Sequence, residues 1–100
     1  MYIAMNRFHI KKGFEKDFEK IWLKRETHLE GFSGFKNFNL IKGKSNEDFT
    51  LYASHSTWTT EKDFINWTKS DAFRNAHKNA GQNSNMYLGH PVFEGFSVII

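Results

Sequence analysis

Three residues far apart in the sequence have side chains that could together bind a flat, metal-containing ligand. His77 and Trp67 lie in one helix-like run, and Asn6 lies in the apolar segment at the N-terminus. A neutral imidazole can bind haem iron, and surrounding aromatic rings can hold the flat macrocycle. An amide can donate a hydrogen bond to a bound oxygen atom. The combination therefore indicates a ligand site, and each residue must also be weighed alone.

Taken singly, each of the three has a simpler explanation. A lone His77 is typical of a partly exposed helix histidine. Asn6 could form a structural hydrogen bond to a neighbouring strand or helix end. Trp67 could be an ordinary core residue of an amphipathic helix. Only their joint placement favours a site.

The spacing of Trp67 and His77 sets a geometric condition on that site. Ten residues of continuous helix span about 15 Å. Both side chains can therefore touch one ligand only if the ligand is broad and flat, or if the helix breaks between them. Ser70 followed by Asp71 can cap a new helix and supply that break.

The pattern of apolar residues predicts the elements that position these side chains. Alternating apolar residues favour strands, and apolar residues at helical spacing favour helices. Gly31 suits the end of the first helix, with His28 near its C-terminal dipole. The polar segment 81–89 is expected to be a mobile loop. In chain order we predict a strand over 2–11, a helix over 14–30, a strand over 35–42, a hairpin connection over 43–48, a strand over 49–58, a helix beginning at Thr60, a helix over 71–80 and a strand over 91–100.

This order is typical of the α+β ferredoxin-like fold, a β-α-β-β-α-β chain with an antiparallel sheet and helices on one face. One hundred residues correspond to a single domain, 1–100. The two helical regions, 14–30 and the segments between Thr60 and Ala80, cannot cover both sheet faces, so Ile3 and Met5 on the outward face need a partner. A homodimer that packs sheet against sheet, forming a dimeric α/β-barrel assembly, is expected.

Composition excludes several classes of function. The chain has no cysteine, which excludes disulfides and thiolate metal sites and fits a reducing, cytoplasmic compartment. A net charge of +3 with interspersed signs is too mild to indicate nucleic-acid binding. No apolar run is long enough to span a membrane, and the N-terminus lacks a secretory pattern. The sequence shows no zinc-ligand, Ser-His-Asp, paired-carboxylate or phosphate-loop constellation.

Four segments carry a family likeness: Asn6-Arg7, Glu30-Gly31-Phe32, Thr57-Trp58 and the run Phe64-Ile65-Asn66-Trp67-Thr68-Lys69-Ser70-Asp71-Ala72-Phe73-Arg74-Asn75-Ala76-His77-Lys78. Together they resemble the antibiotic biosynthesis monooxygenase superfamily. Within it, the combination of Asn6, Trp67 and His77 resembles the IsdG-type haem-degrading monooxygenases. The likeness covers nearly the whole chain.

The resemblance implies a role for each matching residue. His77 would be the axial ligand of haem iron, Asn6 would orient bound dioxygen, and Trp67 would distort the macrocycle. Arg25 matches a basic residue near the family's pocket, and we expect Trp22 to contribute to the pocket wall. The second ring nitrogen of His77 needs a hydrogen-bond acceptor, which could be a backbone carbonyl or Glu94. His90 is a rival iron ligand.

The function implied is a haem oxygenase for which haem is both substrate and cofactor. With O₂ and electrons from an external reductase, the porphyrin ring would open and iron would be released in a bacterial cytoplasm. Two alternatives stay open: a cofactor-independent monooxygenase acting on a quinol or polyketide, and a non-enzymatic haem-binding protein. The sequence carries no flavin or nicotinamide motif that could supply electrons internally.

Overall fold

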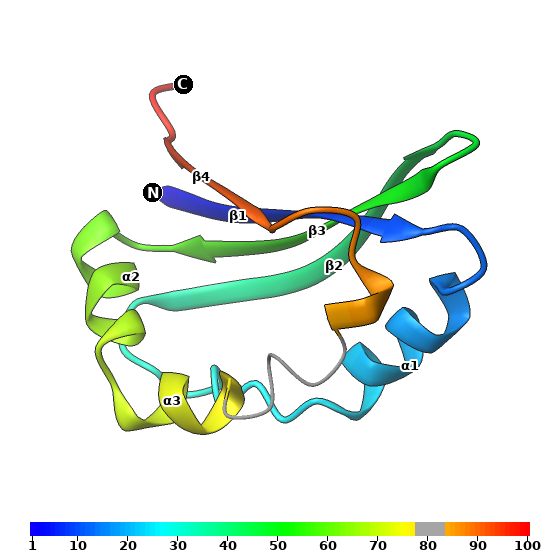
Figure 1. The fold of residues 1–100 in the computed structure, drawn as a ribbon. Helices are drawn as coiled ribbons and strands as arrows, with labels where there is room; N and C mark the ends of the chain where they lie inside the picture. The colour runs from blue at the N-terminus through cyan, green and yellow to red at the C-terminus, as the bar shows by residue number, and fades with distance from the viewer. Residues whose placement is uncertain (78–83) are drawn as a thin grey trace.

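The structure, a computed structural model that describes residues 1–77 and 84–100, contains a four-stranded antiparallel sheet (Figure 1). The strands lie in the order β2-β3-β1-β4, so the first and third strands form the centre. This order confirms the predicted ferredoxin-like fold. The elements are β1 (Tyr2–Lys11), α1 (Glu15–Lys24), β2 (Phe35–Ser45), β3 (Phe49–Trp58), α2 (Glu61–Thr68), α3 (Asp71–His77), the 3₁₀ turn η1 (Ser84–Met86) and β4 (Val92–Ser97).

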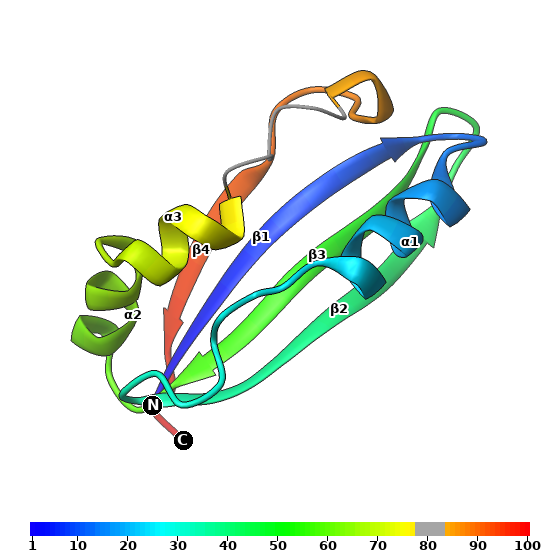
Figure 2. The same cartoon turned by 90° about the horizontal axis from the view of Figure 1, so that it is seen from below.

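The helices cover one face of the sheet and leave the other uncovered (Figures 1 and 2). Side chains alternate between the two faces along a strand. On β1, Ala4, Phe8 and Ile10 are buried beneath the helices, whereas Arg7 is exposed on the opposite face. Among the described helices, none is long and apolar enough to cross a membrane.

The buried side chains form two separate clusters under the helices. Cluster A gathers near one end of the sheet and cluster B near the other, and α1 contributes Phe18 to cluster B while α2 contributes Trp67 to cluster A. On β1 the inward residue between them is Asn6, and on β3 Ser54 lies across from it in register. The junction of the clusters is therefore polar. The buried members of cluster A are Tyr2, Ala4, Leu29, Trp58 and Trp67, and those of cluster B are Phe8, Ile10, Phe18, Tyr52 and Met86.

The first helix ends at Lys24, six residues before the predicted end, and that prediction was wrong. Arg25 has extended backbone angles, φ −72° and ψ 130°. From Lys24 to Leu29, five residues of helix would advance only about 7.5 Å, whereas extended chain advances up to about 17 Å. After Arg25 the chain leaves the helix, and Leu29 packs in cluster A rather than in cluster B. His28, with φ 58°, is consequently not a helix-end residue.

The ends of two strands also differ from the prediction. β2 continues to Ser45 because an irregularity after Lys42 inserts one extra residue before Ser45 pairs with Thr50. β4 ends at Ser97 rather than at residue 100, although the Val98 N–H still donates to the Met1 carbonyl at 2.9 Å. The strands over 2–11 and 49–58 and the helix start after Thr60 are confirmed.

The predicted mobile loop over 81–89 is wrong for its described part. Met86 is buried in cluster B, Tyr87 forms a bridge with Ile10, and the Leu88 N–H donates to the His9 carbonyl at 2.7 Å. Residues 84–89 are thus anchored to β1. Residues 81–83, and the last three residues of the predicted helix 71–80, lie outside the described part of the chain.

Candidate functional site

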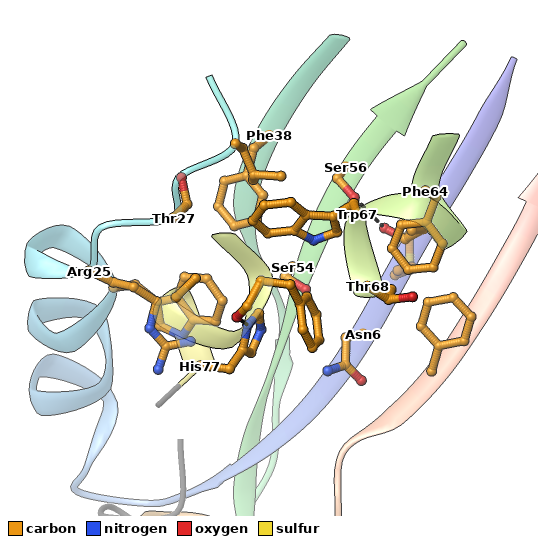
Figure 3. Close-up of a pocket in the computed structure, with 17 residues that line it drawn as sticks. Asn6, Arg25, Thr27, Phe38, Ser54, Ser56, Phe64, Trp67, Thr68 and His77 are labelled. Carbon is orange, nitrogen blue, oxygen red and sulfur yellow. Dashed lines mark hydrogen bonds between the residues drawn. The ribbon is translucent and has the colours of Figure 1, made fainter. Parts of the chain in front are cut away.

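A cavity of about 410 Å³ lies at the junction of the two clusters (Figure 3). A second cavity of about 440 Å³ adjoins it and shares Asn6, Ser54 and His77 with it. Both volumes fall in the range of roughly 300–1,000 Å³ that is usual for small-molecule sites. All five residues predicted from the sequence line the first cavity: Asn6, Trp22, Arg25, Trp67 and His77.

The predicted helix break between Trp67 and His77 is confirmed. α2 ends at Thr68 and α3 begins at Asp71. Ser70 makes the junction, because its hydroxyl donates to the Trp67 carbonyl at 2.6 Å and accepts the Phe73 N–H at 3.1 Å. Two short helices, rather than one long one, thus bring Trp67 and His77 to a single cavity.

Phe73 fixes the orientation of the His77 ring. His77 Nδ1 lies 2.9 Å from the Phe73 carbonyl oxygen, and the two rings stack with centroids 4.1 Å apart. A carbonyl only accepts, so Nδ1 carries the hydrogen and the lone pair of a neutral imidazole is on Nε2. Of the two acceptors considered, the backbone carbonyl is the one found. Glu94 instead pairs with Arg7 at 2.6 Å.

Asn6 and Ser54 form the polar floor of the cavity. They face each other across β1 and β3, and both line the two cavities. Within the described part of the chain, neither side chain has a hydrogen-bond partner, so the expected alternative of a structural hydrogen bond for Asn6 is not found there. Two polar groups are therefore available to a ligand. Ser54 carries no sequence pattern that would have identified it.

Trp67 is both a core residue and a wall of the cavity. Its side chain is only 5% exposed and belongs to cluster A. It packs edge-on against Phe32 and Phe73, with centroid distances of 5.3 and 5.7 Å. The core interpretation and the pocket interpretation of this residue are thus compatible.

Trp22 and Arg25 form the wall on the α1 side. The Trp22 ring stacks on Phe38 at 5.6 Å, and the Arg25 guanidinium lies 4.3 Å above the Trp22 ring. Trp22 Nε1 is buried and has no hydrogen-bond partner among the described residues. Burial lowers the pKa of Arg25, and attraction to Tyr87 opposes that shift. The early end of α1 is what turns Arg25 toward this site.

Five described residues after α3 line the second cavity and not the first: Ser84, Tyr87, Gly89, His90 and Pro91. His90, the rival iron ligand, is exposed there and does not reach the first cavity. Tyr87 also lines it and was not predicted, because its segment has the composition of a loop. In the described residues, no group of three or more His, Cys, Asp or Glu side chains could hold a metal ion.

Comparison with known proteins places this chain in a family. The family described as antibiotic biosynthesis monooxygenase matches residues 1–79. The heme oxygenase (staphylobilin-producing) of Staphylococcus epidermidis is 37% identical over 84 residues, 82% of this chain and 78% of the relative, and that of Staphylococcus haemolyticus is 36% identical over 86 residues, 84% and 80% of the two chains. The heme-degrader MhuD of Mycobacterium tuberculosis, solved with two hemes bound in its active site, shares the fold with a TM-score of 0.75 at 22% identity, over 100% of this chain and 97% of that one. The chain therefore belongs to the antibiotic biosynthesis monooxygenase family.

Proposed function

We propose that this protein is a haem-degrading monooxygenase of the IsdG type. One observation carries the proposal: Asn6, Trp67 and His77 line a single cavity, and the Phe73 carbonyl orients the His77 ring. The similarity to the staphylobilin-producing heme oxygenases supports the same activity.

The residues around the cavity fit haem as substrate and cofactor. A metal-bound histidine usually donates its other ring N–H to a carbonyl or carboxylate, and His77 makes such a contact with Phe73. The cavity walls are aromatic, with Trp22, Trp67 and Phe73 among them. Flat aromatic surfaces of this kind suit a planar macrocycle.

His77 would bind the iron through Nε2 as a neutral imidazole. Because α3 is short but firmly capped by Ser70, the ligand has a fixed support. Binding should weaken as the imidazole takes up a proton at acidic pH, since the protonated ring has no lone pair for the metal.

Asn6 and Trp67 would act on the bound ligand from the sheet and from α2. The Asn6 amide has donors without partners in the described structure and would donate to a ligand oxygen. Trp67 is held by Phe32 and Phe73, so it would press rigidly on the macrocycle. Arg25 and Trp22 would complete the cofactor-binding wall, with Arg25 available to a carboxylate of the ligand.

When bound, haem would supply the iron that reacts with O₂ and the ring that is oxidised and opened. The protein would supply position, orientation and exclusion of water. Electrons would come from an external reductase, and a cytoplasmic location, in which released iron can be used, belongs to the same proposal.

The proposal includes a homodimer formed through the uncovered sheet face. Phe96 lies beside Ile3 on that face and is 44% exposed, and Val92, beside Arg7, is 51% exposed. Large side chains with this exposure on a face without helices are typical of a subunit interface.

A haem titration followed by absorbance tests the proposal, with ascorbate then added in air and catalase present to remove peroxide. We expect stoichiometric binding and decay of the Soret band for the wild type. His77→Ala should bind haem poorly, because the iron ligand is gone. His90→Ala is the matched control: it removes the rival imidazole but leaves His77 in place, so haem should still bind.

The alternatives give different results in the same experiment. Binding that requires His77 but is followed by no decay would identify a non-enzymatic haem-binding protein. No haem binding by the wild type would overturn the proposal and favour a cofactor-independent monooxygenase acting on an organic substrate. Loss of haem binding in His90→Ala but not in His77→Ala would show that His90, rather than His77, binds the iron.

A further inference from the structure

The second cavity makes one end of the combined site polar and cationic. Arg25, Tyr87 and His90 line it, whereas the far end of the first cavity is lined by apolar side chains such as Phe64 and Phe93. No Asp or Glu side chain is among the described residues that line either cavity. A ligand with an apolar body and a negative charge at one end would match this distribution.

Arg25 is a half-buried cation with no carboxylate partner among the described residues. It makes no ion pair among the described residues, and residues 78–83 contain no Asp or Glu in their sequence. A partly desolvated charge without a counter-charge is costly, so a ligand carboxylate would stabilise it. Its guanidinium is confined above the Trp22 ring, which limits the positions such a carboxylate could take.

Tyr87 is held rigidly near this cation. Its backbone bridges to Ile10, which ties the segment to β1. Its ring packs edge-on against Phe8 and Phe18, with centroid distances of 5.9 and 6.0 Å. The ring is therefore fixed by cluster B while the side chain lines the same cavity as Arg25.

We propose that Tyr87 is a ligand-positioning residue whose hydroxyl donates to the same ligand carboxylate that Arg25 binds. The proposal rests on the proposed function for the identity of the ligand, a porphyrin that carries carboxylates on one side. In addition, the pair of Arg25 and Tyr87 determines which side of the porphyrin faces η1. Charge-assisted hydrogen bonds of this kind are stronger than neutral ones.

The state of the Tyr87 hydroxyl supports that role. Burial raises the pKa of Tyr87, against an opposing attraction to Arg25, so the hydroxyl stays protonated and able to donate. Arg25 and Tyr87 also line the same cavity, so one carboxylate there could be bound by both groups.

The test compares binding of iron-free protoporphyrin IX with binding of its dimethyl ester, measured by quenching of tryptophan fluorescence. The iron-free ligands remove any contribution from His77 coordination. Tyr87→Phe keeps the ring packing and removes only the hydroxyl. Tyr2→Phe is the matched control, because Tyr2 is buried in cluster A and lines neither cavity.

We expect the wild type to prefer the dicarboxylate over the ester. Tyr87→Phe should weaken dicarboxylate binding about tenfold and leave ester binding unchanged, as loss of one hydrogen bond to a charged group predicts. Arg25→Gln should reduce the same preference, and combining it with Tyr87→Phe should add less than the sum of the two losses. Tyr2→Phe should leave both affinities unchanged.

Equal weakening of both ligands by Tyr87→Phe, or no weakening of either, would overturn the inference while leaving the proposed function intact. Equal wild-type affinity for both ligands would do the same. Failure of the wild type to bind either porphyrin or haem would overturn the proposed function, and this inference with it.

Discussion

Replacing Trp67 with phenylalanine separates its contribution to the core from its contribution to the site. Large aromatic side chains bury about 150–250 Å², so exchanging an indole for a phenyl ring removes on the order of 50 Å². At roughly 25 cal/mol per Å² this loss costs about 1.3 kcal/mol, and the unfilled space raises the cost to about 2 kcal/mol. With Trp67 only 5% exposed, we expect nearly all of this loss to appear as reduced stability.

Trp58→Phe provides the matched control in the same cluster. Trp58 is fully buried, lines neither cavity, and donates its Nε1–H to the Ser56 hydroxyl at 2.9 Å. Its replacement should cost about 3 kcal/mol, because the hydrogen bond is lost as well as the packing. The control is therefore the more destabilised of the two variants.

The assays are thermal denaturation, haem titration and the rate of Soret decay with ascorbate. We expect Trp67→Phe to lower the melting temperature by about 8–15 °C. It should also slow ring opening while largely preserving haem affinity. Trp58→Phe, although less stable, should open the ring at the wild-type rate at temperatures where it remains folded. A wild-type rate in Trp67→Phe would refute a role beyond the core.

Three further predictions concern stability and assembly. Hydrogen bonds from its own backbone N–H and, to a smaller extent, from the Thr50 hydroxyl lower the pKa of the Glu15 carboxyl from 4.5 to about 2. The ionised carboxylate therefore stabilises the fold above pH 4.5, and this stabilisation is lost as the pH falls toward 2. As the pH falls from 4.5 to 2, the urea midpoint of Glu15→Gln should therefore decrease less than that of the wild type. Equal decreases in the two proteins would contradict this. Ser70→Ala should lower the free energy of unfolding by about 1 kcal/mol and weaken haem binding, because α3 loses its cap; destabilisation with wild-type haem affinity would show that the cap does not support His77. Phe96→Glu should convert the expected dimer to a monomer in sedimentation experiments. A monomeric wild type would contradict the proposed dimer interface.

Elements with local determinants could be predicted from the sequence. The strand over 49–58 has β-favouring residues throughout, and the following helix begins where Thr60 accepts the Asp63 N–H at 3.1 Å. The break at Ser70 was likewise predictable, because a serine before an aspartate is a local capping pattern.

The end of the first helix could not be predicted in this way. Leu29 continues the helical spacing of Phe18 and Trp22, yet it is buried in cluster A, whereas Phe18 belongs to cluster B. Periodicity identifies a buried face but does not say which cluster receives each residue. Tertiary packing decided the boundary, and with it the position of Arg25.

The candidate site was predictable only in part, for a similar reason. Asn6 differs in chemical type from Ala4 and Phe8 on its strand face, and His77 lies in a run that resembles a known family, so both can be noticed in a sequence. Ser54 and Tyr87 are ordinary residues for a strand and a loop, and they become site residues only through pairing with Asn6 and Ile10. Such long-range pairings leave no local pattern.

The most direct test of the central claim measures iron release during a single turnover. Haem-loaded protein would receive ascorbate in air with catalase present, while a ferrous chelator reports free iron and mass spectrometry identifies the tetrapyrrole. We expect iron release in proportion to Soret loss and an opened tetrapyrrole as product, and we expect neither in His77→Ala. Intact haem and no free iron in the wild type would contradict it.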